Sequence, residues 1–259
     1  MTIILAVANQ KGGVGKTTTT INLGDSLARA GHEVLIVDFD PQANAGAGLG
    51  VKAAPGHSSY ELVLGEVVLQ EAVVPTGQER LSIIPATSDL AGAEVELAST
   101  MGREYRLKQM IEGGIESYRY VIIDCPPSVG LLTINALTAA QEVVIPVQCE
   151  YLALEGLGQF TSTLELVRLN LNRELKLRGL LLTMYDRRTT LSQQVAEEVR
   201  RHFPNTFQAV IPRSVRLSEA PSHGLPIRAY EPNSPAATAY RELAEEMLRK
   251  EGAPMEVKP

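Results

Sequence analysis

Residues 10–18 read Gln10-Lys11-Gly12-Gly13-Val14-Gly15-Lys16-Thr17-Thr18, and this glycine-rich loop directly follows the apolar run Ile3–Ala8. The loop leads into a predicted helix that carries Ile21, Leu23 and Leu27. Glycines allow backbone N–H groups to surround phosphate oxygens, and the positive end of the following helix favours the same anion. A strand, a glycine-rich loop and a helix in this order predict a site for the phosphates of a nucleotide.

The last residues of the loop carry its chemistry. Lys16 is expected to contact the β- and γ-phosphates, and the Thr17 hydroxyl is expected to bind Mg²⁺. The alternative is a glycine-rich turn that binds nothing, which would leave Lys16, Thr17 and the flanking elements as coincidences. The residues expected to line the phosphates are Gly12, Gly13, Val14, Gly15, Lys16, Thr17 and Thr18.

Acidic residues follow two other apolar runs. Asp38 and Asp40 come at the end of Val34–Val37, and Asp124 comes directly after Tyr120–Ile123. Carboxylates at the carboxyl ends of parallel strands lie in the crevice where α/β sheets bind ligands. We expect Asp124 to hold Mg²⁺ through water and Asp38 to support the magnesium shell. Asp38 and Asp40 could instead only form the turn that follows the strand.

Short apolar runs recur along the chain, and they are continuous rather than alternating. Such runs are typical of strands buried on both faces of a parallel sheet. Stretches with helical spacing lie between them, such as the one that carries Leu191, Val195 and Val199. This succession predicts an α/β fold with a doubly wound, mostly parallel sheet flanked by helices. The expected strands are Ile3–Ala8, Val34–Val37, Leu81–Ile84, Tyr120–Ile123, Val143–Val147, Leu180–Thr183 and Ala209–Ile211.

The rest of the chain shows no internal repeat and no long linker, so we expect residues 1–259 to form a single domain. Ser234 and Pro235 are typical of a helix start, with serine as the N-cap and proline in the first turn. They predict a final helix through Ala236–Lys250, followed by a frayed tail at 252–259.

Composition excludes several classes of protein. Two cysteines, Cys125 and Cys149, are too few for a disulfide scaffold, and no run reaches the roughly 18 apolar residues of a membrane span. A net charge of −6 and the absence of tryptophan argue against a protein that coats nucleic acid by bulk charge or base stacking. The charge is uneven, however, because residues 168–228 contain 11 basic and 5 acidic groups.

Lys11-Gly12-Gly13-Val14-Gly15-Lys16-Thr17 resembles the deviant Walker A motif of the ParA/MinD superfamily, in which an extra lysine stands early in the loop. An ordinary P-loop has glycine where this chain has Gln10. The resemblance extends to D-x-D-P-Q-x-N at 38–44 and to D-x-P-P at 124–127. It implies an ATPase that uses ATP and Mg²⁺. It also implies a homodimer that sandwiches ATP, in which Lys11 reaches the partner's nucleotide. By the same resemblance Lys11, Lys16 and Asp40 are catalytic, and Asp40 orients the attacking water.

The stretch Ile211–Ser222 is similar to the I-P-R-x-x-R-x-x-E-A-P-S segment of chromosomal-type, Soj-like ParA proteins. In that family the backbone around this segment borders the adenine, which implies that Pro212 and Ser214 bind it. The family more often has asparagine at the position of Ser214.

The resemblance also implies DNA binding, because Arg188 and Arg216 match family positions that contact DNA without sequence preference. Arg187 lies beside the first of them. Guanidinium groups can neutralise phosphates without reading bases, which makes binding sensitive to salt. Taken singly, each arginine is more typical of a surface ion pair, and their concentration in a basic segment favours DNA. The implied partners are double-stranded DNA and a ParB-type protein that stimulates hydrolysis, and the implied location is the cytoplasm, at the nucleoid.

Two other functions remain open from the sequence. A MinD-like membrane switch needs a basic amphipathic helix at the C-terminus, whereas the last helix here contains Glu242, Glu245 and Glu246. No membrane partner is therefore expected. An ATP-dependent carboxylase or ligase is the second alternative, but no motif indicates a pocket for another substrate.

Overall fold

The computed structural model describes residues 1–150 and 153–251. Within these residues, eight strands form one sheet in the order β3-β4-β2-β5-β1-β6-β7-β8. All neighbouring strands are parallel except β3 and β4, which are antiparallel. The strands are β1 (Ile3–Val7), β2 (Val34–Asp38), β3 (Val74–Pro75), β4 (Leu81–Ile84), β5 (Tyr120–Asp124), β6 (Glu142–Gln148), β7 (Lys176–Tyr185) and β8 (Thr206–Pro212).

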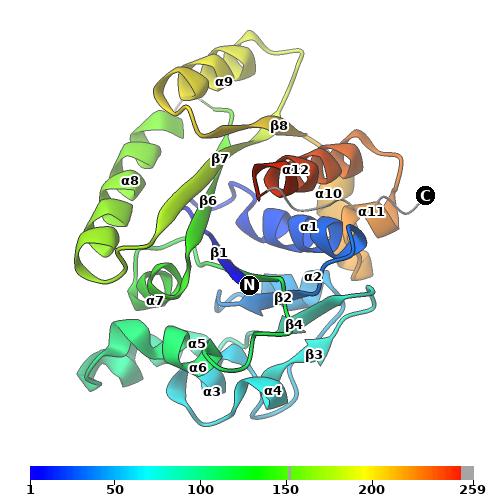
Figure 1. Cartoon of the computed structure of the whole chain (residues 1–259). Coiled ribbons are helices and arrows are strands. Elements are labelled where there is room, and N and C mark those ends of the chain that lie inside the picture. The colour runs from blue at the N-terminus through cyan, green and yellow to red at the C-terminus, as the bar shows by residue number, and fades with distance from the viewer. Residues whose placement is uncertain (151–152, 252–259) are drawn as a thin grey trace.

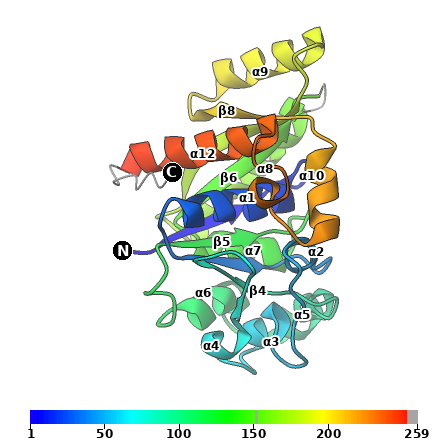
Figure 2. The same ribbon diagram turned by 90° about the vertical axis from the view of Figure 1, so that its right-hand side faces the viewer.

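The helices cover both faces of this sheet (Figures 1 and 2). The longest are α1 (Lys16–Arg29), α8 (Ala153–Asn170), α9 (Thr190–His202) and α12 (Pro235–Glu251). The shorter helices are α2 (Asn44–Gly48), α3 (Ser59–Leu64), α4 (Leu69–Ala72), α5 (Leu90–Glu96), α6 (Arg106–Ile111), α7 (Leu131–Ala139), α10 (Arg216–Glu219) and α11 (Ile227–Tyr230), with 3-10 turns at Leu97–Ser99, Arg103–Tyr105 and Ala220–His223.

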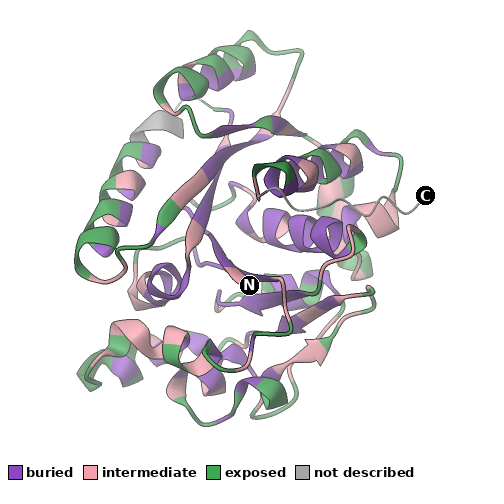
Figure 3. Ribbon diagram, in the orientation of Figure 1, coloured by how far each residue is buried: buried purple, intermediate pink, exposed green. Residues whose placement is uncertain are grey.

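Two hydrophobic cores lie on the two faces of the sheet. Leu35 and Val37 pack with the core that includes α7 and α8, whereas Val34 and Ile36 pack with the core that includes α1 and α12. Successive residues of a strand point to opposite faces, so a strand covered on both sides must be apolar throughout. The central strands are accordingly buried, as Figure 3 shows.

The expected doubly wound fold is confirmed, with small differences at the strand ends. Each expected strand overlaps an observed one, and β4 coincides with the expected Leu81–Ile84. β7 extends well beyond the expected Leu180–Thr183 at both ends. β3 was not expected, because two residues at the edge of a sheet carry no apolar pattern.

The last helix begins as its sequence predicts. The Ser234 Oγ accepts a hydrogen bond from the Ala237 N–H at 3.1 Å, and Pro235 is the first helical residue. The apolar side chains of α12 are buried against the sheet. The expected frayed tail at 252–259 lies outside the described residues. Among the described helices, none is both long enough and apolar enough to cross a membrane.

Glu251 fixes the end of α12 to the sheet. Its carboxylate lies 2.8 Å from the Arg178 guanidinium and 3.0 Å from that of Arg119, and it accepts a hydrogen bond from the Tyr120 hydroxyl at 2.8 Å. The Arg178 side chain is only 10% exposed, so its charge depends on Glu251 and on Glu142, 3.2 Å away. A buried cation left without one of its partners is costly.

We expect Glu251→Ala to lower the free energy of unfolding by about 2–3 kcal/mol, because it removes three contacts and leaves Arg178 underpaired. Chemical denaturation at neutral pH measures this. Glu242→Ala, on an exposed position of the same helix, is the control and should change stability by less than about 0.5 kcal/mol. Equal effects of the two substitutions would contradict the anchoring role of Glu251.

Candidate nucleotide-binding site

The glycine-rich loop lies between the end of β1 and the start of α1. Gly13 and Gly15 have φ angles of 72° and 89°, in the left-handed region that favours glycine. The Asn9 side chain holds the start of the loop, because its Nδ2 donates to the Pro146 carbonyl at 2.7 Å and its Oδ1 accepts from the Lys11 N–H at 3.0 Å. The Thr183 hydroxyl donates to the Val14 carbonyl at 2.8 Å, which ties the loop to β7.

Lys16 lies inside the loop, and only 6% of the residue is exposed. Its Nζ donates to the Lys11 carbonyl at 3.1 Å. Burial lowers the pKa of Lys16, and the nearby Asp124 carboxylate acts in the opposite direction. A buried ammonium group with a backbone carbonyl as its acceptor is well placed to exchange that acceptor for phosphate oxygens.

The two residues that precede the glycines behave differently. Lys11 is partly exposed, and its side chain makes no ion pair among the described residues. Gln10 instead binds α8, because its Nε2 donates to the Gly156 carbonyl at 3.1 Å and to Gln159 Oε1 at 2.8 Å. Gln10 therefore anchors the loop to α8, a role that sequence reasoning missed.

Asp124 lies beside the loop because β5 pairs with β1, where Val7 is opposite Asp124. The residue is fully buried, and its Oδ1 accepts a hydrogen bond from the Thr20 hydroxyl at 3.0 Å. Its Oδ2 is buried without a partner of normal hydrogen-bond geometry. Burial raises the pKa of Asp124 to about 8, the Asp38 carboxylate adds to the rise, and the hydroxyls of Thr17 and Thr20 oppose it.

Asp38 lies directly opposite Asp124 in the pairing of β2 with β5. Its Oδ2 accepts hydrogen bonds from the N–H groups of Ala45 and Gly46, at 3.1 and 2.9 Å. Burial raises the pKa of Asp38, as does the neighbouring Asp40 carboxylate, whereas these backbone hydrogen bonds lower it. Asp38 thus fixes α2 beside the loop, which is a structural role in addition to the expected support of a magnesium shell.

Asp40 follows β2 and is 6% exposed. Its Oδ1 accepts a hydrogen bond from the Gln42 N–H at 3.0 Å, and the next residues turn sharply, with Ala43 at a φ of 52°. A left-handed conformation is unusual for alanine and is often found next to functional sites. The turn holds Asp40 close enough to influence both Lys16 and Asp124 electrostatically.

These residues fit a hydrated magnesium ion. The unpartnered Asp124 Oδ2 and the Thr17 hydroxyl are hard oxygen donors at the positive end of α1. Among the described residues, no cluster of three or more His, Cys, Asp or Glu side chains could hold a metal alone. This agrees with Mg²⁺, which proteins bind through one or two side chains together with water and substrate phosphates.

We expect the stability of the nucleotide-free protein to fall as pH rises, because Asp124 is buried. Its pKa is about 8 in the folded chain, against an ordinary value of 3.8 for an aspartate in water. The folded state therefore holds the proton more tightly, and this stabilisation is complete below about pH 4 and lost as pH rises through about 8. Asp124→Asn stays neutral, so thermal melts should show the variant more stable than the wild type at pH 8 and similar to it at pH 4.

The exposed Asp89→Asn substitution serves as the control and should follow the wild type at every pH. A difference between Asp124→Asn and wild type that does not change with pH would contradict the assignment.

A cavity of about 490 Å³ lies next to the loop. Gly15 and Thr18 line it on the side of α1, and Pro212 and Ser214 line it from the segment after β8. The cavity therefore brings the expected adenine-binding residues to the phosphate loop. It is closed by residues from β7 and the C-terminal segments: Thr183, Met184, Ile211, Arg213, Val215, Leu217, Ser218, Pro221 and Tyr240.

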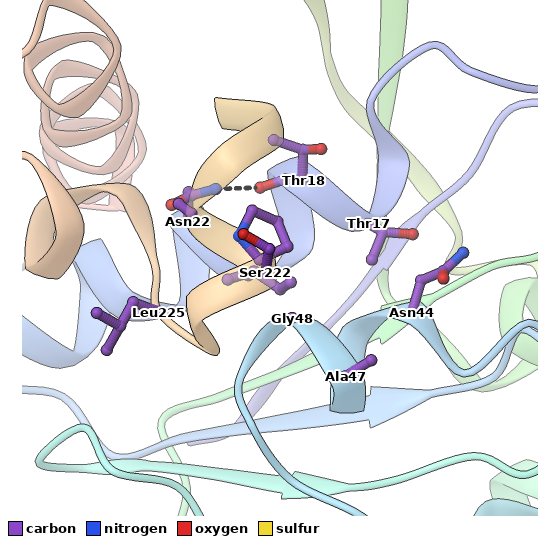
Figure 4. A pocket seen from close by; sticks show the side chains of 11 residues that line it. Thr17, Thr18, Asn22, Asn44, Ala47, Gly48, Ser222 and Leu225 are labelled. Carbon is purple, nitrogen blue, oxygen red and sulfur yellow. Dashed lines mark hydrogen bonds between the residues drawn. The ribbon is translucent and has the colours of Figure 1, made fainter. Parts of the chain in front are cut away.

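A second cavity of about 420 Å³ lies between α1, α2 and the 3-10 turn at 220–223. Thr17 and Asn44 lie toward one end of it and Leu225 toward the other (Figure 4). Asn22 joins α1 to α11, because its Oδ1 accepts from the Ile227 N–H at 2.7 Å, and its Nδ2 donates to the Thr18 carbonyl within α1 at 2.7 Å.

The expected DNA-contacting arginines lie at the same edge of the sheet, Arg187 and Arg188 after β7 and Arg216 at the start of α10. Tyr185 at the end of β7 pairs with Pro212 at the end of β8, so Arg187, Arg188 and Arg216 follow neighbouring strand ends. Arg187 and Arg188 are exposed, and the Arg216 side chain is 54% exposed. Both Arg188 and Arg216 form ion pairs within the chain, with Asp186 and with Glu219 and Glu231 respectively.

Comparison with known proteins identifies the family. A family profile described as "AAA domain" matches residues 1–177. The sporulation initiation inhibitor protein Soj of Bacillus subtilis is 54% identical over 246 residues, which cover 94% of this chain and 97% of that protein. The chromosome partitioning protein ParA of Myxococcus xanthus is 50% identical over 250 residues, which cover 96% of this chain and 88% of that protein. The chain belongs to the Soj/ParA family.

Solved structures agree with the Soj/ParA fold. The cell division ATPase MinD of Pyrococcus furiosus superposes with a TM-score of 0.81 at 27% identity, covering 96% of this chain and 100% of that one. A Mycobacterium smegmatis protein described as cobyrinic acid a,c-diamide synthase, with bound ATP analogue and magnesium, superposes with a TM-score of 0.83 at 41% identity over the whole of both chains. Membership of the ParA/MinD superfamily, which the loop motif predicted, is confirmed. The predicted ATPase activity and the predicted cofactors, ATP and Mg²⁺, are confirmed at the level of the family.

Proposed function

We propose that this chain is a DNA-partitioning ATPase that segregates a chromosome or plasmid. The observation that carries the proposal is that the nucleotide-binding site and the exposed arginines lie at the same edge of the sheet. The phosphate loop and Asp124 lie at the carboxyl ends of β1 and β5, and the exposed arginines follow the ends of β7 and β8. The adenine cavity connects them, since Gly15, Met184 and Arg213 all line it. The sequence identity of 54% with Soj and of 50% with ParA supports the same function.

In the proposed mechanism, backbone N–H groups of residues 12–18 and the Lys16 ammonium group hold the β- and γ-phosphates. Thr17 and Asp124 hold Mg²⁺, Asp124 through water, with Asp38 in support, and the ion would neutralise charge on the phosphates. Pro212 and Ser214 border the adenine. Asp40 is a poor base for water, so its role is to orient the water that attacks the γ-phosphate.

Lys11 completes the site from across a homodimer. Its partly exposed side chain makes no ion pair among the described residues, and it stands at the mouth of the loop, where a partner's nucleotide can be reached. Dimerisation duplicates the exposed Arg187, Arg188 and Arg216, so an acidic monomer acquires a paired basic surface that binds double-stranded DNA without reading bases. Hydrolysis, stimulated by a ParB-type partner, separates the dimer and releases the DNA. The protein then acts in the cytoplasm, at the nucleoid.

We expect Lys16→Ala to abolish nucleotide binding and Asp40→Ala to bind ATP normally while hydrolysing it at least about 100-fold more slowly, since orientation of the nucleophile is lost. Binding of a fluorescent ATP analogue and phosphate release measure the two properties separately. Normal turnover by Asp40→Ala would show that its catalytic assignment is wrong.

DNA co-sedimentation with ATP tests the arginine surface. Arg216→Glu should reduce retention on DNA at least about tenfold at moderate salt, because it reverses a charge at the phosphate-binding surface. Arg168→Glu is the matched control, since Arg168 is also exposed in the basic segment. It lies near the end of α8, before the start of β7, and so at the opposite edge of the sheet from Arg216, which follows the end of β8. Equal retention of both variants, or retention that does not depend on ATP, would contradict the proposal.

The likeness to MinD makes a membrane switch the second candidate. In the described part of the chain, however, α12 buries its apolar face against the sheet and cannot present it to lipid without leaving its core. ATP-dependent flotation with liposomes would favour this candidate over DNA partitioning.

The likeness to a protein described as a diamide synthase makes a small-molecule enzyme the third candidate. An amide synthase that takes ammonia from glutamine needs a reactive thiolate. Both cysteines of this chain are buried, and burial raises the pKa of Cys149 to about 12. Neither thiol is therefore suited to this chemistry. ATP hydrolysis that DNA and a partner protein stimulate, with no small-molecule acceptor present, would exclude this candidate.

A further inference from the structure

Arg188 is held by a carboxylate two residues earlier in the chain. Its Nε lies 3.0 Å from Asp186 Oδ1, its terminal nitrogen lies 2.8 Å from Oδ2, and its backbone N–H donates to Oδ1 at 3.0 Å. The pair is bidentate, which is the strongest geometry for arginine and carboxylate. Although 87% of the arginine side chain is exposed, its charge is neutralised where it stands.

Arg216 is held in a similar way by two carboxylates. A terminal nitrogen lies 2.7 Å from Glu219 Oε2, and its Nε lies 3.1 Å from Glu231 Oε2. The Tyr230 hydroxyl donates to Glu219 Oε2 at 3.3 Å, and the Glu231 N–H donates to the Ile227 carbonyl at 2.7 Å. The Glu219 carboxylate therefore has a second partner, and the backbone of Glu231 is held at the end of α11. We name Asp186, Glu219 and Glu231 the latch carboxylates.

Two of the latch carboxylates, Asp186 and Glu219, lie within two residues of side chains that line the adenine cavity. Met184 lines the cavity two residues before Asp186, and its φ of 51° is a conformation that methionine rarely adopts. Leu217 and Ser218 line it between Arg216 and Glu219. A nucleotide base in this cavity would therefore contact the two segments that carry the ion pairs.

The carboxylates occupy Nε and one terminal nitrogen of each arginine, so a DNA phosphate must either displace them or bind the remaining N–H groups beside a carboxylate that repels it. Arg188 with Asp186 is neutral overall, and Arg216 with Glu219 and Glu231 carries a net charge of −1, so each carboxylate would repel the DNA backbone unless it moved or took up a cation. An arginine without a carboxylate partner therefore binds DNA more tightly than one held by a latch carboxylate, even when both are fully exposed.

We propose that Asp186, Glu219 and Glu231 set the DNA affinity of this chain by holding Arg188 and Arg216 in internal ion pairs, which nucleotide in the adjacent cavity opens. This inference rests on the proposed DNA-partitioning function and adds to it the residues that keep the nucleotide-free protein off DNA. The latch carboxylates are positioning residues, since they act through the arginines and touch neither DNA nor nucleotide.

The test uses Asp186→Asn and the double substitution Glu219→Gln with Glu231→Gln. Glu197→Gln is the matched control, because Glu197 is an exposed carboxylate in the same basic segment that forms no ion pair among the described residues. It changes the net charge as much as Asp186→Asn without freeing an arginine. Fluorescence anisotropy with a labelled DNA duplex, at several salt concentrations, measures binding without nucleotide and with ATP.

Without nucleotide, Asp186→Asn and the double variant should bind DNA about fivefold more tightly than wild type, and ATP should increase their affinity less. Their plots of log affinity against log salt should be steeper by about one ion per arginine freed, because no displaced carboxylate retains a cation. Glu197→Gln should keep the wild-type slope. Adding Arg188→Ala to Asp186→Asn should remove the gain.

Affinities and salt slopes of the latch variants that match those of Glu197→Gln would overturn the inference and leave the proposed function intact, provided that wild type binds DNA with ATP. Failure of wild type to bind DNA under any nucleotide condition would overturn both.

Discussion

The insertion of β5 between β1 and β2 is the constraint on which the site depends. β1 leads into the phosphate loop, and β2 and β5 end in Asp38 and Asp124, so parallel pairing brings the loop and both carboxylates to one edge. The arrangement requires Asp124 to be fully buried with one oxygen unpartnered. Burial of this kind is unfavourable in itself and becomes favourable only when a cation shares the space. The stability of this edge of the sheet therefore depends on whether a cation is bound beside Asp124.

The central strands and the loop could be predicted because each depends on local chemistry. A strand covered on both faces must be apolar at every position, which makes Val34–Val37 and Tyr120–Ile123 recognisable, and only Gly13 and Gly15 permit the left-handed turns of the loop. β3 and the full length of β7 were not predictable in this way. The ends of edge and near-edge strands are set by pairing with a neighbour, and polar residues such as Lys176 are allowed there.

Long-range polar contacts made the rest of the site unpredictable. Gln10 binds α8 at residues 156 and 159, and Glu251 joins three side chains from β5, β7 and the residue before β5. No spacing in the sequence indicates such partners, because they depend on which elements meet in space. The count of basic residues in 168–228 was incomplete for the same reason, because it does not show which charges are paired. The excess of arginine in residues 168–228 is real, but the count treats Arg188 and Arg216 as free cations, whereas each is already paired with a nearby carboxylate.

Asn22 illustrates how one side chain can couple distant parts of the chain. Its Nδ2 donates a hydrogen bond to the Thr18 carbonyl one turn earlier in α1, and its Oδ1 accepts one from the Ile227 N–H, so the side chain joins α1 to a segment 205 residues away. The amide offers a donor and an acceptor on separate atoms, whereas a carboxylate lacks the donor and an aliphatic side chain lacks both. The position of α11 is therefore coupled to the helix that begins at the phosphate loop, through one side chain.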